Sequence, residues 1–136
     1  MRRRNPQVLL VERDHATAEM YRVGLLMGGF AVDMARDGEE GIQRMLLGEL
    51  PDIVVIDLDL PRIDRDTPRK DSLDMLTTLR SIHLVPTVPV VALSSDATGF
   101  DDALSMGATA CMANWRTTPR DLARKVAQLL GEPRGS

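Results

Sequence analysis

The residues with the clearest chemical potential are two aspartates, Asp57 and Asp59, which close the apolar run at residues 53–56. An unbroken run of isoleucine and valine is typical of a strand buried on both faces, as in a parallel sheet. Pro61 cannot donate a hydrogen bond to a neighbouring strand, so the strand must end before it. We therefore expect Asp57 at the carboxyl end of a central strand, where open α/β sheets place their chemistry.

Polar side chains also follow three other apolar segments, at residues 8–11, 89–93 and 109–113. They are Glu12, Arg13, Ser94, Ser95 and Asn114. If the strands are parallel, these side chains gather with Asp57 at one edge of the sheet. Two interpretations stay open at this point. The oxygens could hold a divalent cation beside a carboxylate that accepts a phosphoryl group, or the polar residues could simply cap strands and helices.

The elements that must position these residues alternate along the chain. Five apolar segments are separated by segments with helical spacing of apolar residues, which predicts parallel strands joined by right-handed helical crossovers. Residue types that cap helices precede four of the helical segments. The predicted N-caps are Asp14, Asp37, Asp71 and Thr118.

Helical spacing also predicts which face of each helix is buried. In the first helix the repeating apolar residues are Ala16, Met20, Val23 and Met27. The same spacing predicts apolar stripes on later helices. These are Ile42, Met45 and Leu46, then Phe100, Ala103 and Leu104, and finally Leu122, Val126, Leu129 and Leu130.

Composition limits the class of protein. The chain has 136 residues, of which 43% are hydrophobic and 3% aromatic, so one domain with an aliphatic core is expected. A net charge of -3 gives no reason to expect nucleic-acid binding. A single cysteine, Cys111, excludes an internal disulfide and a cysteine-based metal cluster. Without a signal-peptide pattern or a long apolar span, we expect a cytoplasmic protein that does not contact membranes.

We expect three regions in the chain. Residues 1–6 form a basic N-terminal tail, residues 7–131 form the folded domain, and residues 132–136 form a C-terminal tail or the start of a linker. No internal repeat and no second domain is visible in the sequence.

The ordered set of segments resembles the receiver domain of bacterial two-component response regulators, over residues 7 to 131. The matching segments, in family order, are Leu9-Leu10-Val11-Glu12, the stretch from Asp57 to Asp64, the stretch from Pro89 to Ser94, and Gly107-Ala108 with the closing helix. The resemblance implies an α/β, flavodoxin-like fold. Its five-stranded parallel sheet has the order 2-1-3-4-5, with helices on both faces.

The resemblance also implies roles for the clustered residues. Asp57 would be the phosphoacceptor, within an acidic pocket that includes Glu12 and Asp59, and it would take a phosphoryl group from a sensor histidine kinase with Mg²⁺ bound. Ser94 would be the switch hydroxyl that moves toward the phosphoryl oxygens. The domain would act on a partner protein or an output domain, and homodimers are frequent among such domains.

Three positions depart from the family pattern. Arg13 stands where a second carboxylate would bind Mg²⁺, Asn114 replaces a lysine, and Cys111 replaces an aromatic switch residue. The Arg13 guanidinium could form a charge-assisted pair with Asp57. Our hypothesis is that Arg13 occupies the place of Mg²⁺ and fixes the site in one state.

A second hypothesis keeps the cation. Glu12, Asp57 and the backbone carbonyl of Asp59 would still hold Mg²⁺, and one of three nearby cations would replace the missing lysine. The candidates are Arg62, Arg69 and Lys70.

The main functional hypothesis is a receiver domain that works as a protein-binding switch and not as an enzyme, with Mg²⁺-dependent phosphorylation of Asp57 weakened or absent. The alternative is a receiver that is fully phosphorylatable by a histidine kinase. A more remote alternative is a phosphatase that forms an aspartyl-phosphate, because Asp57-Leu58-Asp59 resembles the Asp-x-Asp motif of haloacid-dehalogenase-like enzymes.

Overall fold

The computed structural model describes residues 5–58, 70–81, 88–95 and 98–131. Predictions for Asp59 and for the cations Arg62 and Arg69 lie outside these residues. The strands are β1 (Gln7–Val11), β2 (Ala31–Ala35), β3 (Ile53–Asp57), β4 (Val90–Ser94) and β5 (Ala110–Ala113). The helices are α1 (His15–Met27), α2 (Gly38–Leu47), α3 (Lys70–Ser81), α4 (Thr98–Ser105) and α5 (Pro119–Leu130), with a 3₁₀ turn, η1 (Asn114–Arg116), after β5.

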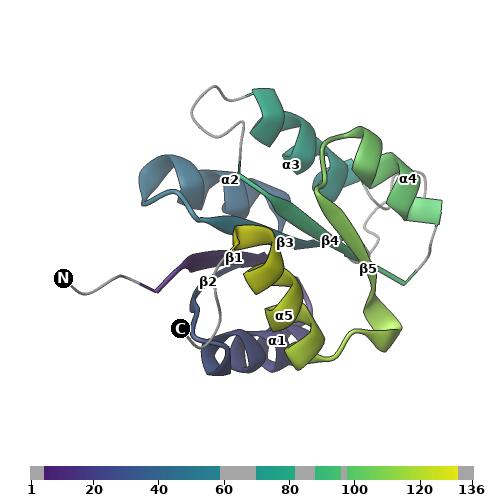
Figure 1. Ribbon diagram of the computed structural model, residues 1–136. Coiled ribbons are helices and arrows are strands. Elements are labelled where there is room, and N and C mark those ends of the chain that lie inside the picture. Colours follow the sequence, from purple (N-terminus) through teal and green to yellow (C-terminus); the bar gives the residue numbers. More distant parts are fainter. Residues whose placement is uncertain (1–4, 59–69, 82–87, 96–97, 132–136) are drawn as a thin grey trace.

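All of the strand pairs are parallel, and the sheet order is β2-β1-β3-β4-β5. Helices α1 and α5 cover one face of the sheet, and α2, α3 and α4 cover the other (Figure 1). This arrangement confirms the predicted flavodoxin-like fold. It also explains the unbroken apolar run at residues 53–56, because β3 is covered on both faces and is buried along its whole length.

The two faces of the sheet carry separate apolar cores. On the side of α1 and α5 the core includes Tyr21, Phe30 and Leu122. On the other side it includes Met45 and Leu76, among others. The sheet therefore lies between two hydrophobic layers that hold its strand ends in fixed positions.

Local capping signals were good guides to where the helices begin. The side chains of Asp14, Asp37 and Thr118 each accept a backbone N–H three residues further on, as predicted. The prediction for Asp71 was wrong, because α3 already begins at Lys70 and Asp71 lies inside its first turn. Aspartate is favourable both as an N-cap and near a helix N-terminus, so its presence locates a helix start only to within a residue or two.

The predicted buried face of α1 was wrong. Met20 and Val23 are 46% and 43% exposed and Met27 is 83% exposed, whereas Tyr21 and Leu25 are buried. Helix α1 carries two apolar stripes of equal period, and periodicity cannot say which one the sheet covers. Leu46 of α2 and Leu104 of α4 were also assigned to the core, but they are exposed.

Close contact with α5 helps to set the orientation of α1. A Cβ atom built at Gly24 would lie 2.3 Å from the Cβ of Pro119, and one at Gly28 would lie 3.0 Å from the Cβ of Ala123. These glycines let the two helices approach each other more closely than larger residues would. The observed face of α1 therefore depends on α5, which is almost a hundred residues away in the sequence.

Substitution of Gly24 by valine should lower the free energy of unfolding by at least about 2 kcal/mol, because the added carbons overlap Pro119. Urea denaturation followed by circular dichroism measures the change. Ala16→Val on the exposed face of the same helix is the matched control, and it should cost only about 0.5 kcal/mol. Equal effects of the two substitutions would contradict the close packing of α1 on α5.

Candidate functional site

Two buried carboxyl groups lie side by side at the carboxyl edge of the sheet. Val11 of β1 is level with Ile56 of β3, so the residues that follow them, Glu12 and Asp57, are neighbours. Each is 5% exposed, and their side chains share a hydrogen bond. Glu12 also accepts the backbone N–H of Asp14 at 3.0 Å through Oε2. The structure thus brings together two of the three residues that were predicted to form an acidic pocket.

Burial and the neighbouring charge change the protonation of this pair. Burial, followed by the charge of Asp57 and the hydrogen bond between the two groups, raises the pKa of Glu12 to about 8, although the N–H of Asp14 acts in the opposite direction. At neutral pH, Glu12 therefore retains its proton beside Asp57. A buried acid pair that must hold a proton is a site where a cation would relieve repulsion.

Arg13 points away from this pair. Its Nη2 atom lies 3.9 Å from Oδ2 of Asp37 at the start of α2, and its side chain is 39% exposed. The prediction that its guanidinium pairs with Asp57 was therefore wrong, because Arg13 pairs with Asp37. The long arginine side chain reaches instead from the end of β1 to the start of α2, where Asp37 supplies an opposite charge.

The predicted switch hydroxyl lies one strand away from the acid pair. Asp57 is level with Leu93 of β4, so Ser94 is one residue further along the neighbouring strand. Ser94 is almost fully buried, and Ser95 after it is exposed. The position of Ser94 agrees with that expected from the resemblance, and its role as a switch stays a prediction.

Two of the residues that depart from the expected family pattern, Cys111 and Asn114, lie on β5 and directly after it. Cys111 is half-buried, burial raises the pKa of its thiol, and its Sγ atom is 3.8 Å from the carbonyl oxygen of Phe100. Asn114 opens η1, and its Oδ1 atom accepts a hydrogen bond from Tyr21 Oη at 3.3 Å. The position of the expected lysine is therefore held by a neutral amide that is bound to α1.

Tyr21 was not singled out from the sequence. It is almost fully buried on α1, and its hydroxyl also donates to the carbonyl oxygen of Thr117 at 3.1 Å. Burial, with the charges of Glu12 and Asp57, raises the pKa of Tyr21. A signal was available in the sequence, because a buried tyrosine usually needs a partner for its hydroxyl. The helical stripe chosen for α1 had placed Tyr21 on the wrong side.

The oxygens present fit a hard divalent cation. Mg²⁺ keeps several waters and commonly uses only one or two carboxylates of a protein, and Glu12 and Asp57 supply two. Among the described residues no group of three or more histidine, cysteine, aspartate or glutamate side chains gathers as a metal site. The fit therefore rests on the acid pair.

Sequence relatives of the chain are bacterial regulators, although no model of a protein family matches it. An uncharacterized transcriptional regulatory protein of Bacillus subtilis, YcbL, is 33% identical over 99 residues, which are 73% of this chain and 39% of YcbL. The response regulator MprA of Mycobacterium tuberculosis is 36% identical over 58 residues, which are 43% of this chain and 25% of MprA.

Solved structures match almost the whole chain. A candidate response regulator from Chloroflexus aurantiacus has a TM-score of 0.81 and 26% identity, covering 95% of this chain and all of that chain. The chain is a receiver domain of the response-regulator family.

Two further structures share the fold of this receiver domain. The chemotaxis response regulator CheY4 of Vibrio cholerae has a TM-score of 0.79 at 17% identity, covering 93% of this chain and 99% of that one. The receiver domain of a signal transduction histidine kinase from Syntrophus aciditrophicus has a TM-score of 0.77 at 23% identity, covering 96% and 94% of the two chains.

The receiver domain spans only a quarter to two fifths of the length of the curated relatives named above. In the part of the chain that the structure describes, no helix has the length and apolar character needed to cross a membrane.

Proposed function

We propose that this receiver domain is a protein-binding switch in which phosphoryl transfer to Asp57 is retained but slow. The observation that supports this proposal is the buried Glu12–Asp57 pair, with Arg13 turned away toward Asp37. In this proposal Asp57 is the acceptor carboxylate and Glu12 is one carboxylate for a cation. The second carboxylate and the lysine of the family pattern are missing, because arginine and asparagine stand there.

The chemistry of such a site is mostly positioning and charge neutralisation. An oxygen of Asp57 attacks the phosphorus of the donor, a new P–O bond forms, and the donor's leaving group departs with the electrons of the broken bond. Mg²⁺, when bound, supplies neutralisation of the phosphoryl charge, and Glu12 and Asp57 would hold it. In this chain Asn114 offers a neutral amide where the resemblance predicts a positive charge, so less of the developing charge is balanced.

The position of Arg13 favours a slow site over a locked one. A guanidinium seated on Asp57 would compete with the cation, but the ion pair of Arg13 is with Asp37 on the neighbouring helix. Arg13 therefore does not block a cation at the Glu12–Asp57 pair, and the loss is limited to one ligand and the charge of the lysine. We therefore prefer weakened phosphorylation to its complete absence.

The partners follow from this function. We expect a sensor histidine kinase as the phosphodonor, and a partner protein or an output domain as the receiver of the signal, with a homodimer as one form of the active state. The curated relatives are much longer than this domain, which supports an output function outside it. We expect no enzymatic turnover, no nucleic-acid or membrane binding by this domain, and a cytoplasmic location.

Incubation with Mg²⁺ and a small phosphodonor such as acetyl phosphate tests the proposal. We expect intact-mass spectrometry to show one added phosphoryl group on the wild-type protein, accumulating over many minutes, and none on the Asp57→Ala variant. EDTA should prevent the addition. A wild-type protein that takes up no phosphoryl group, or an Asp57→Ala variant that takes up as much as wild type, would show that the proposal is wrong.

A further inference from the structure

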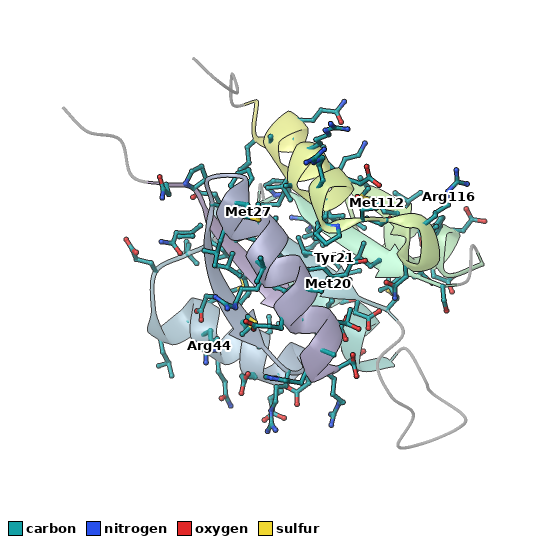
Figure 2. The ribbon with its side chains drawn as sticks, turned by 90° about the horizontal axis from the view of Figure 1, so that it is seen from below. Met20, Tyr21, Met27, Arg44, Met112 and Arg116 are labelled. Carbon is teal, nitrogen blue, oxygen red and sulfur yellow. The ribbon has the colours of Figure 1, made fainter. Side chains whose placement is uncertain are left out.

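The connection between β5 and α5 is held in place by α1. The hydroxyl of Tyr21, a buried residue of α1, donates to the carbonyl oxygen of Thr117 at 3.1 Å and to Oδ1 of Asn114 at 3.3 Å. These two acceptors lie at the end and at the start of the same turn. Figure 2 shows Tyr21 on the side of α1 that faces α5. One side chain thus ties the whole turn to a distant helix.

The turn is also closed on itself. The side-chain hydroxyl of Thr117 donates to the carbonyl oxygen of Ala113, the last residue of β5, at 2.5 Å. Thr118 then caps α5, and it exchanges hydrogen bonds with Asp121 in both directions. We call residues 114–118, which run from the end of β5 to the start of α5, the β5–α5 corner.

A second contact holds the corner from the next turn of α1. Gly24 lies three residues after Tyr21, and its backbone meets Pro119 so closely that a Cβ atom would overlap the proline. Residues three apart lie on neighbouring turns of one side of a helix. One side of α1 therefore makes both contacts. Tyr21 binds the corner by hydrogen bonds, and Gly24 packs against Pro119 in the first turn of α5.

In the part of the chain that the structure describes, the hydrogen bonds from α1 to the corner join uncharged groups. The donor is a phenol, and the acceptors are a backbone carbonyl and a side-chain amide. The raised pKa of Tyr21 keeps its hydroxyl protonated at any physiological pH, so it stays a donor. A lysine at position 114 would instead be a cation whose preferred contact depends on how much negative charge Asp57 carries.

We propose that Tyr21 is a latch that keeps the β5–α5 corner in one conformation whatever the charge on Asp57. The corner lies at the same edge of the sheet as the acid pair, yet its bonds to α1 do not change when that site gains or loses charge. Phosphorylation would then leave the corner and the start of α5 unmoved. This inference rests on the proposed function only for the phosphorylated state.

Amide hydrogen exchange of the corner measures the latch directly. Tyr21→Phe removes a single hydroxyl and keeps the ring, and we expect the amides of Thr117 and Thr118 to exchange at least tenfold faster in this variant. Thr77→Val removes an exposed hydroxyl on α3 and should leave these rates unchanged. Unchanged corner rates in Tyr21→Phe would overturn the latch.

Two changes of charge at Asp57 test whether the conformation of the β5–α5 corner is independent of that charge. Asp57→Asn removes the negative charge, and beryllofluoride with Mg²⁺ adds a stable mimic of the phosphoryl group. In both cases we expect the amides of residues 57–58 and 94–95 to change their exchange rates, and those of Thr117 and Thr118 to stay within twofold of wild type. A corner that responds as strongly as residues 94–95 would overturn the inference.

The two charge experiments separate the two proposals. If beryllofluoride changes no amide, the proposed phosphoacceptor function fails, while the Asp57→Asn comparison still decides the latch. If beryllofluoride changes the amides of residues 57–58 and the corner follows, the site binds its anion and only the latch is wrong.

Discussion

Exchange of Arg13 for aspartate together with Asn114 for lysine should raise the initial rate of phosphate uptake by about 100-fold. The physical reason is charge neutralisation in the transition state, where one well-placed donor or cation is worth ~10²–10³ in rate. The aspartate adds a carboxylate for the cation beside Glu12 and Asp57, and the lysine adds a positive charge for the phosphoryl oxygens. Intact mass against time, with acetyl phosphate and Mg²⁺, measures the rate.

The single substitutions identify the source of the gain. Arg13→Asp alone should tighten Mg²⁺ binding, because it supplies a ligand, whereas Asn114→Lys alone should leave Mg²⁺ affinity nearly unchanged and act on the rate. Arg13→Ala is the control for loss of the Asp37 contact, and we expect only a small change from it because that contact is long and exposed. If Arg13→Ala raised the rate as much as Arg13→Asp, the arginine would be an inhibitor of the site, as in the locked-site hypothesis.

Replacement of Glu12 by glutamine should stabilise the protein at alkaline pH. Burial and the charge of Asp57 raise the pKa of Glu12 from 4.5 to about 8 in the folded state. Between these values the folded protein keeps a proton that the unfolded chain has lost, so the free energy of unfolding of wild type falls as pH rises through this window. Glutamine has no proton to lose and avoids this cost.

The expected difference therefore grows with pH. Below about pH 4.5 the two proteins should be similarly stable, and above pH 8 Glu12→Gln should be more stable by on the order of 2 kcal/mol or more, since each unit of pKa displacement corresponds to about 1.4 kcal/mol. Urea denaturation at a series of pH values, with EDTA to exclude cations, measures it. Glu19→Gln is the matched control on α1, because its pKa is lowered by Arg22 and the sign of its effect should be opposite.

If the difference in free energy of unfolding between Glu12→Gln and wild type did not change with pH over this range, the result would contradict the buried acid pair. Mg²⁺ provides an internal check, because a cation held by Glu12 and Asp57 requires Glu12 to lose its proton. Saturating Mg²⁺ should therefore stabilise wild type more than Glu12→Gln at pH 8. Equal stabilisation of the two proteins would place the cation elsewhere.

Much of the fold followed from local patterns in the sequence. The apolar run before Asp57 is typical of a strand covered on both faces, as found, and the N-caps at Asp14, Asp37 and Thr118 are local hydrogen bonds between residues three apart. Such features depend on neighbours in the chain, so the sequence contains the information needed to predict them. The positions of Asp57 and Ser94 at one edge followed from the parallel sheet.

Other features depended on contacts between distant parts of the chain. The buried side of α1 was decided by the sheet and by Pro119 against Gly24, not by a period that both of its stripes share. The direction of the Arg13 side chain was decided by its contact with Asp37 at the start of α2. The hydrogen bonds of Tyr21 to the β5–α5 corner likewise join residues that are far apart in the sequence.

The same division applies to the candidate site. The sequence by itself determined that Asp57 closes a buried strand. It also puts arginine and asparagine at the two positions where the family resemblance predicts a carboxylate and a lysine. Only the tertiary structure decided that Glu12 holds a proton against Asp57 and that a tyrosine hydroxyl binds the asparagine. Burial and through-space charge set these properties, and both arise from residues that are brought together only when the sheet and its two layers of helices assemble.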